Sequence, residues 1–342
     1  MDFSSDTSAP AHPKVLEALV DANQGTASSY GADPQTVMLN TKLTALLGTD
    51  DFDVWPCASG TASNALALSV LCRPTQAILC HSEAHIERDE RGAPEFFTGG
   101  GKLQLLPGQA ARIDETALRD ALAKIDPSFV HETPAAVLSL TNLTECGTAY
   151  TPETIAHYAA LAKATGLSVH LDGARLANVL AHQGTSLADM SWRSGVDVLC
   201  LGLTKTGALG CELIILFGDT RARFGELKAR AKRAGHMPPK LRYLSAQANA
   251  LLSNDLWITL AAAANRQARM LSSLLCSQPG VSLAYPVEGN EVFAILPDGL
   301  AAYLEENGAK FYPWPGGSYR FVCNWATMDA DIEALRICLA AA

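Results

Sequence analysis

The segment VHLDGARLAN, residues 169–178, decides the fold that we expect for this chain. Its apolar run ends at Leu171, and an acidic residue, Asp172, follows directly with a glycine after it. The carboxyl ends of strands are where α/β proteins meet their ligands. A lone Asp-Gly pair can equally well cap the next helix, so the segment has to be interpreted together with its neighbours.

A second segment, VDVLCLGLTKTG at residues 196–207, places Lys205 in a small polar turn after another apolar run. An ammonium group after a buried strand is costly unless it is paired or used chemically. A carboxylate and an amine at successive strand ends are what pyridoxal phosphate (PLP) requires. The carboxylate keeps the pyridine nitrogen protonated, and the amine forms the Schiff base.

A phosphate site is expected in CASGTASNALALSVL, residues 57–71. Ser59, Gly60 and Thr61 form a small-residue turn that opens a helix directly after an expected strand. Backbone N–H groups at the positive end of a helix bind phosphate, and hydroxyl groups can add to them. An ordinary helix N-cap would have the same residues, so this turn alone is weak evidence.

Two further segments carry candidate side chains. His85, in CHSEAHIERDERGAPEFF at residues 80–97, can stack on a pyridine ring and exchange protons, or it can be a structural histidine. We interpret the acidic residues around it as a solvated loop. Arg320, in GGSYRFVCNW at residues 316–325, can bind a carboxylate with both arms of its guanidinium, a task that Arg175 can share. A surface ion pair is the alternative for Arg320.

The chain alternates strands and helices between about residues 50 and 217, which predicts an α/β fold. Two helices have readable starts, one with Asp33 before Pro34 and one with Thr151 before Pro152. After residue 254 the pattern changes to a smaller α+β unit. We therefore expect a large domain over residues 1–250 and a small C-terminal domain over residues 251–342. The expected strands of the large domain are residues 53–56, 77–80, 103–106, 136–140, 168–171, 196–201 and 212–217.

Composition excludes several classes of protein. With 48% hydrophobic and 18% charged residues the 342-residue chain can bury a large core, and its net charge of -9 offers no basic surface for nucleic acid. The nine cysteines are scattered without a C-x-x-C pair, which predicts reduced, mostly buried thiols and no metal site. No segment suits a membrane span or a targeting signal, so we expect a cytoplasmic protein.

These motifs, taken in order, resemble the low-specificity L-threonine aldolase family, which has the aminotransferase-like PLP fold (fold type I). The resemblance also covers FSSDTSAPAHP at residues 3–13, SSYGADP at 28–34 and LRYLSA at 241–246. It implies a mostly parallel seven-stranded sheet, a smaller C-terminal α+β domain, and an N-terminal arm that packs on that domain or on a partner. It also implies PLP as cofactor, and retro-aldol cleavage of L-threonine, L-allo-threonine and related β-hydroxy-α-amino acids to glycine and an aldehyde.

The resemblance also assigns roles to residues. Lys205 would be the Schiff-base lysine, preceded by Thr204 where many relatives have serine, and Asp172 would be the pyridinium partner. His85 would stack on the ring. The substrate carboxylate would be bound by Ser5, Arg175 and Arg320, and its hydroxyl would lie near His131. Family members are homodimers or homotetramers, so Tyr30 and Arg242 would reach across the interface. The segment AGHMPPKLRYL at residues 234–244 lacks the glycine-rich form of many relatives, which weakens the assignment of Arg242.

Two alternatives stay open at this point. Another PLP reaction on the same fold, β-elimination or transamination, would use the same lysine and carboxylate. A nucleotide-binding α/β protein would use the Ser59–Thr61 turn without covalent chemistry.

Overall fold

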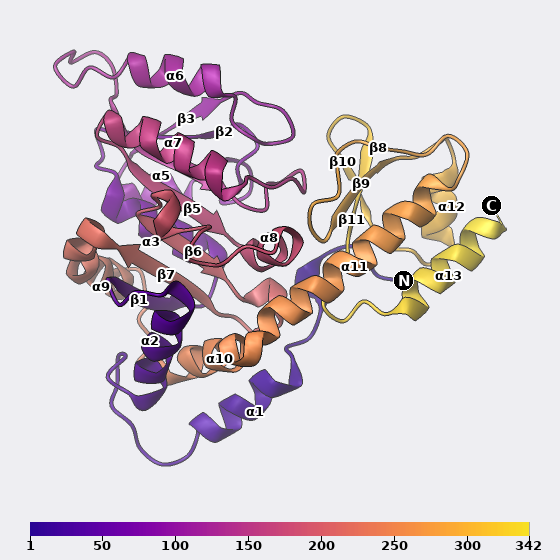
Figure 1. Ribbon diagram of the computed structural model, residues 1–342, viewed down its shortest axis with the longest axis horizontal. Helices are drawn as coiled ribbons and strands as arrows, with labels where there is room; N and C mark the ends of the chain where they lie inside the picture. The colour runs from indigo at the N-terminus through magenta and orange to yellow at the C-terminus, as the bar shows by residue number, and fades with distance from the viewer. Residues whose placement is uncertain (342) are drawn as a thin grey trace.

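Seven apolar segments form a large sheet in the computed structural model, which describes residues 1–341 (Figure 1). The strand order is β1-β7-β6-β5-β4-β2-β3, and only β7 runs antiparallel to its neighbours. All seven expected strands are confirmed, with ends within two residues of the prediction. Their bounds are β1 (Phe52–Cys57), β2 (Ala77–His81), β3 (Lys102–Leu106), β4 (Ala135–Thr141), β5 (Ser168–Gly173), β6 (Val198–Gly202) and β7 (Glu212–Phe217).

Both faces of this sheet are buried, as expected for strands that are apolar on both sides. Val198 and Cys200 of β6 pack into one apolar cluster, whereas Leu199 and Leu201 pack into the other. The first cluster is closed by α3 (Gly60–Leu71) and α9 (Phe224–Arg233). The second is closed by α2 (Pro34–Leu47), α6 (Glu115–Ala123), α7 (Pro152–Ala164) and α8 (Leu176–Gln183).

The predicted helix starts are confirmed by their capping bonds. The Asp33 carboxylate accepts the Thr36 amide at 2.9 Å, and the Thr151 hydroxyl accepts the Thr154 amide at 3.2 Å. Gly48 ends α2 in the left-handed conformation, with φ 64°. Seven of the nine cysteines are buried, and all nine are free thiols.

A second sheet follows in the C-terminal part, with order β10-β11-β9-β8 and antiparallel pairing throughout. Its strands are β8 (Ser282–Leu283), β9 (Glu291–Ile295), β10 (Tyr312–Trp314) and β11 (Ser318–Val322); β10 was not predicted. The helices around it are α11 (Leu256–Cys276), α12 (Leu300–Glu306) and α13 (Asp329–Ala340). Since α11 packs against both α8 and β9, the domain boundary at residue 250 stays a prediction.

Three of the remaining α-helices belong to the first hundred residues of the sequence, and the fourth, α10, comes shortly before α11 (Figure 1). They are α1 (Pro13–Ala22), α4 (His85–Arg88), α5 (Ala93–Thr98) and α10 (Arg242–Leu252). No helix among residues 1–341 is both long enough and apolar enough to cross a membrane.

The N-terminal arm lies on the small sheet. Phe3 is fully buried in the apolar cluster of that sheet, and its carbonyl accepts the Val322 amide at 2.7 Å. Its own amide donates to the Lys310 carbonyl at 2.8 Å. Because Phe3 is held in this way, the N-terminal arm is anchored three residues before Asp6.

We predict that Phe3→Ala destabilises the protein by about 3–5 kcal/mol, the usual cost of emptying a buried phenylalanine site. Urea unfolding followed by circular dichroism measures the change. Phe129→Ala is the matched control, because Phe129 is half exposed and such surface changes cost within about 0.5 kcal/mol. Equal effects of the two substitutions would contradict the anchoring role of Phe3.

Candidate active site

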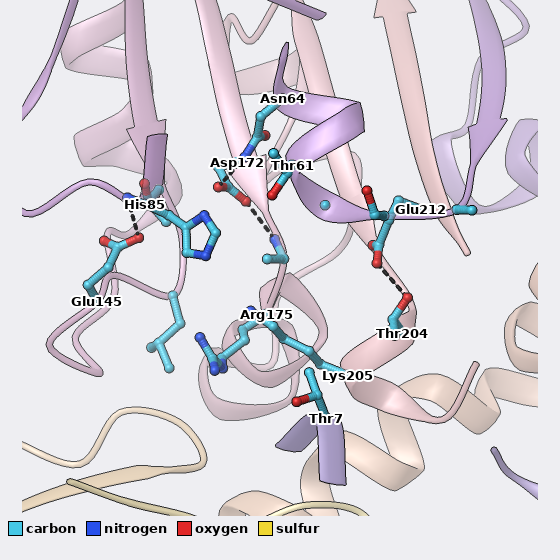
Figure 2. A pocket seen from close by; sticks show the side chains of 16 residues that line it. Thr7, Thr61, Asn64, His85, Glu145, Asp172, Arg175, Thr204, Lys205 and Glu212 are labelled. Atoms are coloured by element: carbon cyan, nitrogen blue, oxygen red, sulfur yellow. Dashed lines mark hydrogen bonds between the residues drawn. The ribbon is translucent and has the colours of Figure 1, made fainter. Parts of the chain in front are cut away.

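A cavity of about 210 Å³ opens at the carboxyl ends of the parallel strands (Figure 2). Strands β4 and β5 run parallel to each other, as do β5 and β6, so the residues that follow these strands meet at one edge of the sheet. The chain thereby gathers eight of the thirteen predicted site residues around this cavity. They are Ser59, Gly60, Thr61, His85, Asp172, Arg175, Thr204 and Lys205.

Asp172 is buried at the end of β5 and bound from two sides. Its Oδ1 accepts the amide of Ala174 at 3.0 Å, and its Oδ2 accepts the side-chain amide of Asn64 at 2.8 Å. A buried carboxylate needs such donors, because an unpaired one is strongly destabilising. The orientation of Asp172 toward the cavity is therefore set by α3 and by the turn after β5.

Asn64 links Asp172 to His85 through a second carboxylate. The same amide nitrogen donates to Glu90 Oε1 at 2.9 Å, and that oxygen lies 2.8 Å from His85 Nδ1. Glu145 Oε1 accepts the backbone amide of His85 at 2.9 Å (Figure 2). The imidazole of His85 is thus held from its ring and from its backbone.

The interpretation of Glu90 as part of a solvated loop is wrong, since its side chain is fully buried. Burial lowers the pKa of His85, but the hydrogen bond with Glu90 and the charge of Asp172 outweigh it and leave the pKa raised. The pKa of Glu90 is raised by burial. Burial also raises the pKa of Glu145 to about 8.

Lys205 lies in a short 3-10 turn, Thr204–Thr206, after β6. Burial, and after it the charge of Arg175, lower the pKa of Lys205. The turn is held by Glu212 of β7, whose two oxygens accept the Thr204 hydroxyl at 2.5 Å and the Leu203 amide at 3.1 Å. Burial raises the pKa of Glu212 to about 7.

The start of α3 faces the same cavity. Ser59 caps this helix, and its side-chain oxygen accepts the Ala62 amide at 3.2 Å. The amides of Gly60 and Thr61 lie in the first turn, where a helix leaves N–H groups without carbonyl partners. A Cβ atom at Gly60 would meet no atom within 4 Å, so the space beside it is open. The Ser59–Thr61 turn therefore caps α3 and still leaves space for a phosphate beside it.

Arg175 enters the cavity from the turn before α8 and is bound by the N-terminal arm. Its Nε and Nη2 donate to the two oxygens of Asp6 at 2.6 and 3.1 Å. Ser5, beside Asp6, does not line the cavity, and its hydroxyl is 2.8 Å from that of Thr7, which does. Asp6 is thereby a site residue that the sequence motif contained but that we did not single out.

The side chain of Arg320 is 11% exposed and is not among those that line the cavity. Its guanidinium is bound to Glu291 of β9, so the interpretation as a surface ion pair is wrong, although an ion pair exists. Tyr30 and Arg242 do not line the cavity, and the Tyr30 amide donates to the Pro239 carbonyl at 3.0 Å. Their predicted reach into a partner's site stays a prediction.

The expectation for His131 is wrong within this chain. His131 lies in the exposed loop before β4, where its ring packs against that of Phe129. The cavity is at the carboxyl end of β4, so the length of the strand separates the two. His131 precedes β4 in the sequence and therefore lies at the amino end of that strand.

The fold and this cavity define a class of protein, the β-eliminating lyase family, whose family model matches residues 2–299. Enzymes of this family have the PLP-dependent aminotransferase-like fold. An aminotransferase structure from Thermus thermophilus has that fold as well, with a TM-score of 0.73 at 18% identity over 100% of this chain and 95% of the other.

Within that class the chain belongs to the low-specificity L-threonine aldolase family of carbon–carbon lyases. It is 39% identical to the low specificity L-threonine aldolase of Pseudomonas aeruginosa, over 98% of this chain and 94% of the relative. It is 26% identical to the enzyme of the same name from Saccharomyces cerevisiae, over 86% and 74%. A threonine aldolase structure from Leishmania major matches with a TM-score of 0.92 at 28% identity, over 99% and 98%.

We predict that Glu90→Gln lowers the pKa of His85, because an amide loses the charge that favours the imidazolium. Histidine-selective NMR titration measures this pKa, with His85 assigned from His85→Asn. The pair stabilises the fold below the unfolded pKa of histidine and loses this effect as the pH rises through the raised folded pKa. The stability difference between the variant and the wild type should therefore shrink above that pH.

Glu87→Gln is the control for this prediction, because Glu87 lies on the same short helix and lacks the contact with His85. An unchanged titration of His85 in Glu90→Gln, or an equal shift in both variants, would show that Glu90 does not set its protonation.

Proposed function

We propose that this protein cleaves L-threonine, L-allo-threonine and related β-hydroxy-α-amino acids into glycine and an aldehyde, with PLP as cofactor. The observation that carries the proposal is the convergence of Asp172 and Lys205 on one cavity in a chain of the threonine aldolase family. PLP chemistry requires a carboxylate and an amine from its protein, and both line this cavity.

The residues around the cavity fit the cofactor. Asp172 would hold the ring nitrogen, and His85, which lines the same cavity, would cover a face of the ring. The amides of Gly60 and Thr61, with the hydroxyls of Ser59 and Thr61, would bind the phosphate at the start of α3. Lys205 would bond covalently to the cofactor, and Thr204 holds its turn. When bound, PLP supplies the electron sink for the electron pair of the breaking Cα–Cβ bond.

The substrate's carboxylate would be bound by Arg175, whose Nε and Nη2 are bound to Asp6 and whose Nη1 donates no hydrogen bond to the residues that the structure describes. Thr7, from the N-terminal arm, lies across the cavity from His85 and forms part of the cavity wall (Figure 2). Burial and the charge of Arg175 lower the pKa of Lys205, which increases the share of the unprotonated amine that bonding to the cofactor would require. The β-hydroxyl proton would go to an acceptor near His85, either His85 itself or a water that it orients.

Assembly completes the proposal. We propose a homodimer or homotetramer in the cytoplasm, with Tyr30 and Arg242 serving the partner's site. Several large apolar side chains on α1, α2 and the turn after Lys205 are exposed in the single chain, which supports an interface with a partner chain at this face. They are Leu16, Val20, Val37, Met38 and Leu209, each at least 46% exposed in the single chain. Exposed apolar side chains that gather on one face commonly mark an interface, and a partner chain that covers these five would remove them from water.

Product analysis tests the proposed reaction. The PLP-loaded protein is incubated with L-threonine, L-allo-threonine and phenylserine, and glycine is counted against the matching aldehyde. We expect equal amounts of both, and Lys205→Ala should lose multiple turnover and the bound-cofactor absorbance while staying folded. The second candidate, β-elimination, is suggested by the family model and would give 2-oxobutanoate and ammonia from L-threonine. Those products would replace the proposed function.

Asp172→Asn should leave a folded protein that is nearly inactive, since an amide does not keep a ring nitrogen cationic. Cleavage of L-threonine and thermal unfolding are measured together. Asp197→Asn is the control, because Asp197 lies before β6, away from the cavity. Turnover at the wild-type rate in Asp172→Asn would remove Asp172 from the reaction.

A further inference from the structure

Glu145 is a carboxylate of the cavity wall to which the proposed reaction has so far given no role. It lies in the loop after β4, at the carboxyl end of that strand, where Asp172 and Lys205 also meet the cavity. His131, which was expected near the substrate hydroxyl, lies at the other end of the same strand. The end of β4 that reaches the cavity therefore carries a carboxylate and not an imidazole.

The loop that carries Glu145 is closed by its own hydrogen bonds. The Thr144 amide donates to the Thr148 carbonyl at 2.9 Å. On either side of this turn, Asn142 accepts the Tyr150 amide at 3.0 Å and donates to the Tyr150 carbonyl at 3.1 Å. The position of Glu145 on the cavity wall is therefore set by the backbone around it.

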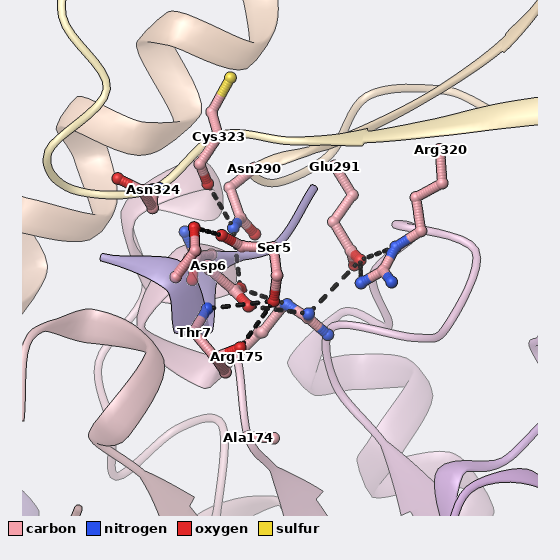
Figure 3. Close-up of polar contacts among 12 residues, drawn as sticks. Ser5, Asp6, Thr7, Ala174, Arg175, Asn290, Glu291, Arg320, Cys323 and Asn324 are labelled. Atoms are coloured by element: carbon pink, nitrogen blue, oxygen red, sulfur yellow. Dashed lines mark hydrogen bonds and ion pairs between the residues drawn. The ribbon is translucent and has the colours of Figure 1, made fainter. Parts of the chain in front are cut away.

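Glu145 is partly buried and has no ion pair with another of the residues 1–341, although protonatable side chains line the same cavity. Arg175 is bound to Asp6 at 2.6 Å (Figure 3), and His85 is bound to Glu90 at 2.8 Å. A carboxylate that is withdrawn from water is costly in its ionised form unless it is paired. An unpaired carboxyl group in a cleft is a candidate for a chemical role.

The structure uses only one oxygen of Glu145. Oε1 accepts the backbone amide of His85 at 2.9 Å, a contact that the oxygen of a glutamine would make as well. Oε2 makes no hydrogen bond to another residue among residues 1–341. Burial, and after it the charge of Asp172, raise the pKa of Glu145 to about 8. A general base is most effective when its pKa is near the working pH, so a carboxyl group has a chemical advantage over an amide here.

We propose that Glu145 is a catalytic residue whose Oε2 accepts the proton of the substrate's β-hydroxyl. As the O–H bond breaks, its electron pair forms the second bond of the aldehyde C=O, and the electron pair of the Cα–Cβ bond stays with the glycine part. Cα then takes up one proton from solvent, and Glu145 releases one to solvent. The inference rests on the proposed function, for which it names the proton acceptor; His85 would then cover the cofactor without taking this proton.

The test compares two reactions of the PLP-loaded protein, of which only one breaks an O–H bond. Cleavage of L-threonine requires the hydroxyl proton to leave, whereas exchange of the α-proton of glycine in deuterated water involves no hydroxyl. Glu145→Gln should cleave L-threonine roughly 100- to 10,000-fold more slowly than the wild type, the usual contribution of a positioned base. The same variant should exchange the α-proton of glycine within about threefold of the wild-type rate, and bind glycine within about twofold, followed by cofactor absorbance.

Glu83→Gln is the matched control, because Glu83 precedes His85 by two residues, pairs with Arg88 and does not line the cavity. It should leave both reactions unchanged. Cleavage by Glu145→Gln within about threefold of the wild-type rate would assign the proton to His85 or to water and overturn the inference. Equal losses of cleavage and of α-proton exchange would also overturn it, because they would show that Glu145 only supports the site.

Glu145→Ala decides the question if the glutamine variant does not fold. Removal of the side chain leaves room for a small carboxylate, so added formate should speed its cleavage of L-threonine at least about tenfold and leave glycine exchange unchanged. No effect of formate on cleavage would then overturn the inference.

Failure of the proposed function gives a different result. In that case the wild type itself releases no glycine from L-threonine, and this inference falls with it. A wild type that cleaves L-threonine, together with a Glu145→Gln variant that cleaves it equally fast, overturns this inference alone.

Discussion

Burial of charge at one edge of the large sheet is the constraint on which the site depends. Asp172 lies at the end of β5 with almost no exposure, and it is stable there only because Ala174 and Asn64 donate to it. The neighbouring carboxylates are paired in the same way. Glu90 accepts a second hydrogen bond from the Asn64 amide, and Asp6 accepts hydrogen bonds from Arg175. The position of each of these charged groups is therefore set by the donors or acceptors that pair with it.

Three distant parts of the chain build this arrangement. The parallel strands bring Asp172 and Lys205 to one edge, while the antiparallel β7 returns Glu212 to the lysine turn. The N-terminal arm, anchored by Phe3 on the small sheet, carries Asp6 to Arg175. Strand β9 of the small sheet adds Glu291. We therefore expect the affinity for a substrate carboxylate to depend on both sheets and on the N-terminal arm.

Much of the fold was predictable from sequence, since apolar runs with turn residues between them mark all seven strands of the large sheet. Asp172 and Lys205 were predictable because each directly follows such a run. Glu90 and Glu291 were not, because burial of a glutamate depends on partners far away in sequence. The prediction for His131 was wrong because the resemblance placed this residue near the substrate. In this chain its loop joins the amino end of β4, whereas the cavity lies at the carboxyl end.

The most direct test of the central claim is to identify the lysine that bonds to the cofactor. The protein is loaded with PLP, reduced with borohydride and digested, and the peptides are analysed by mass spectrometry. We expect the reduced cofactor on the peptide that contains Lys205, in an amount close to one per chain. Attachment to another lysine, or none above the level of Lys205→Ala, would contradict it.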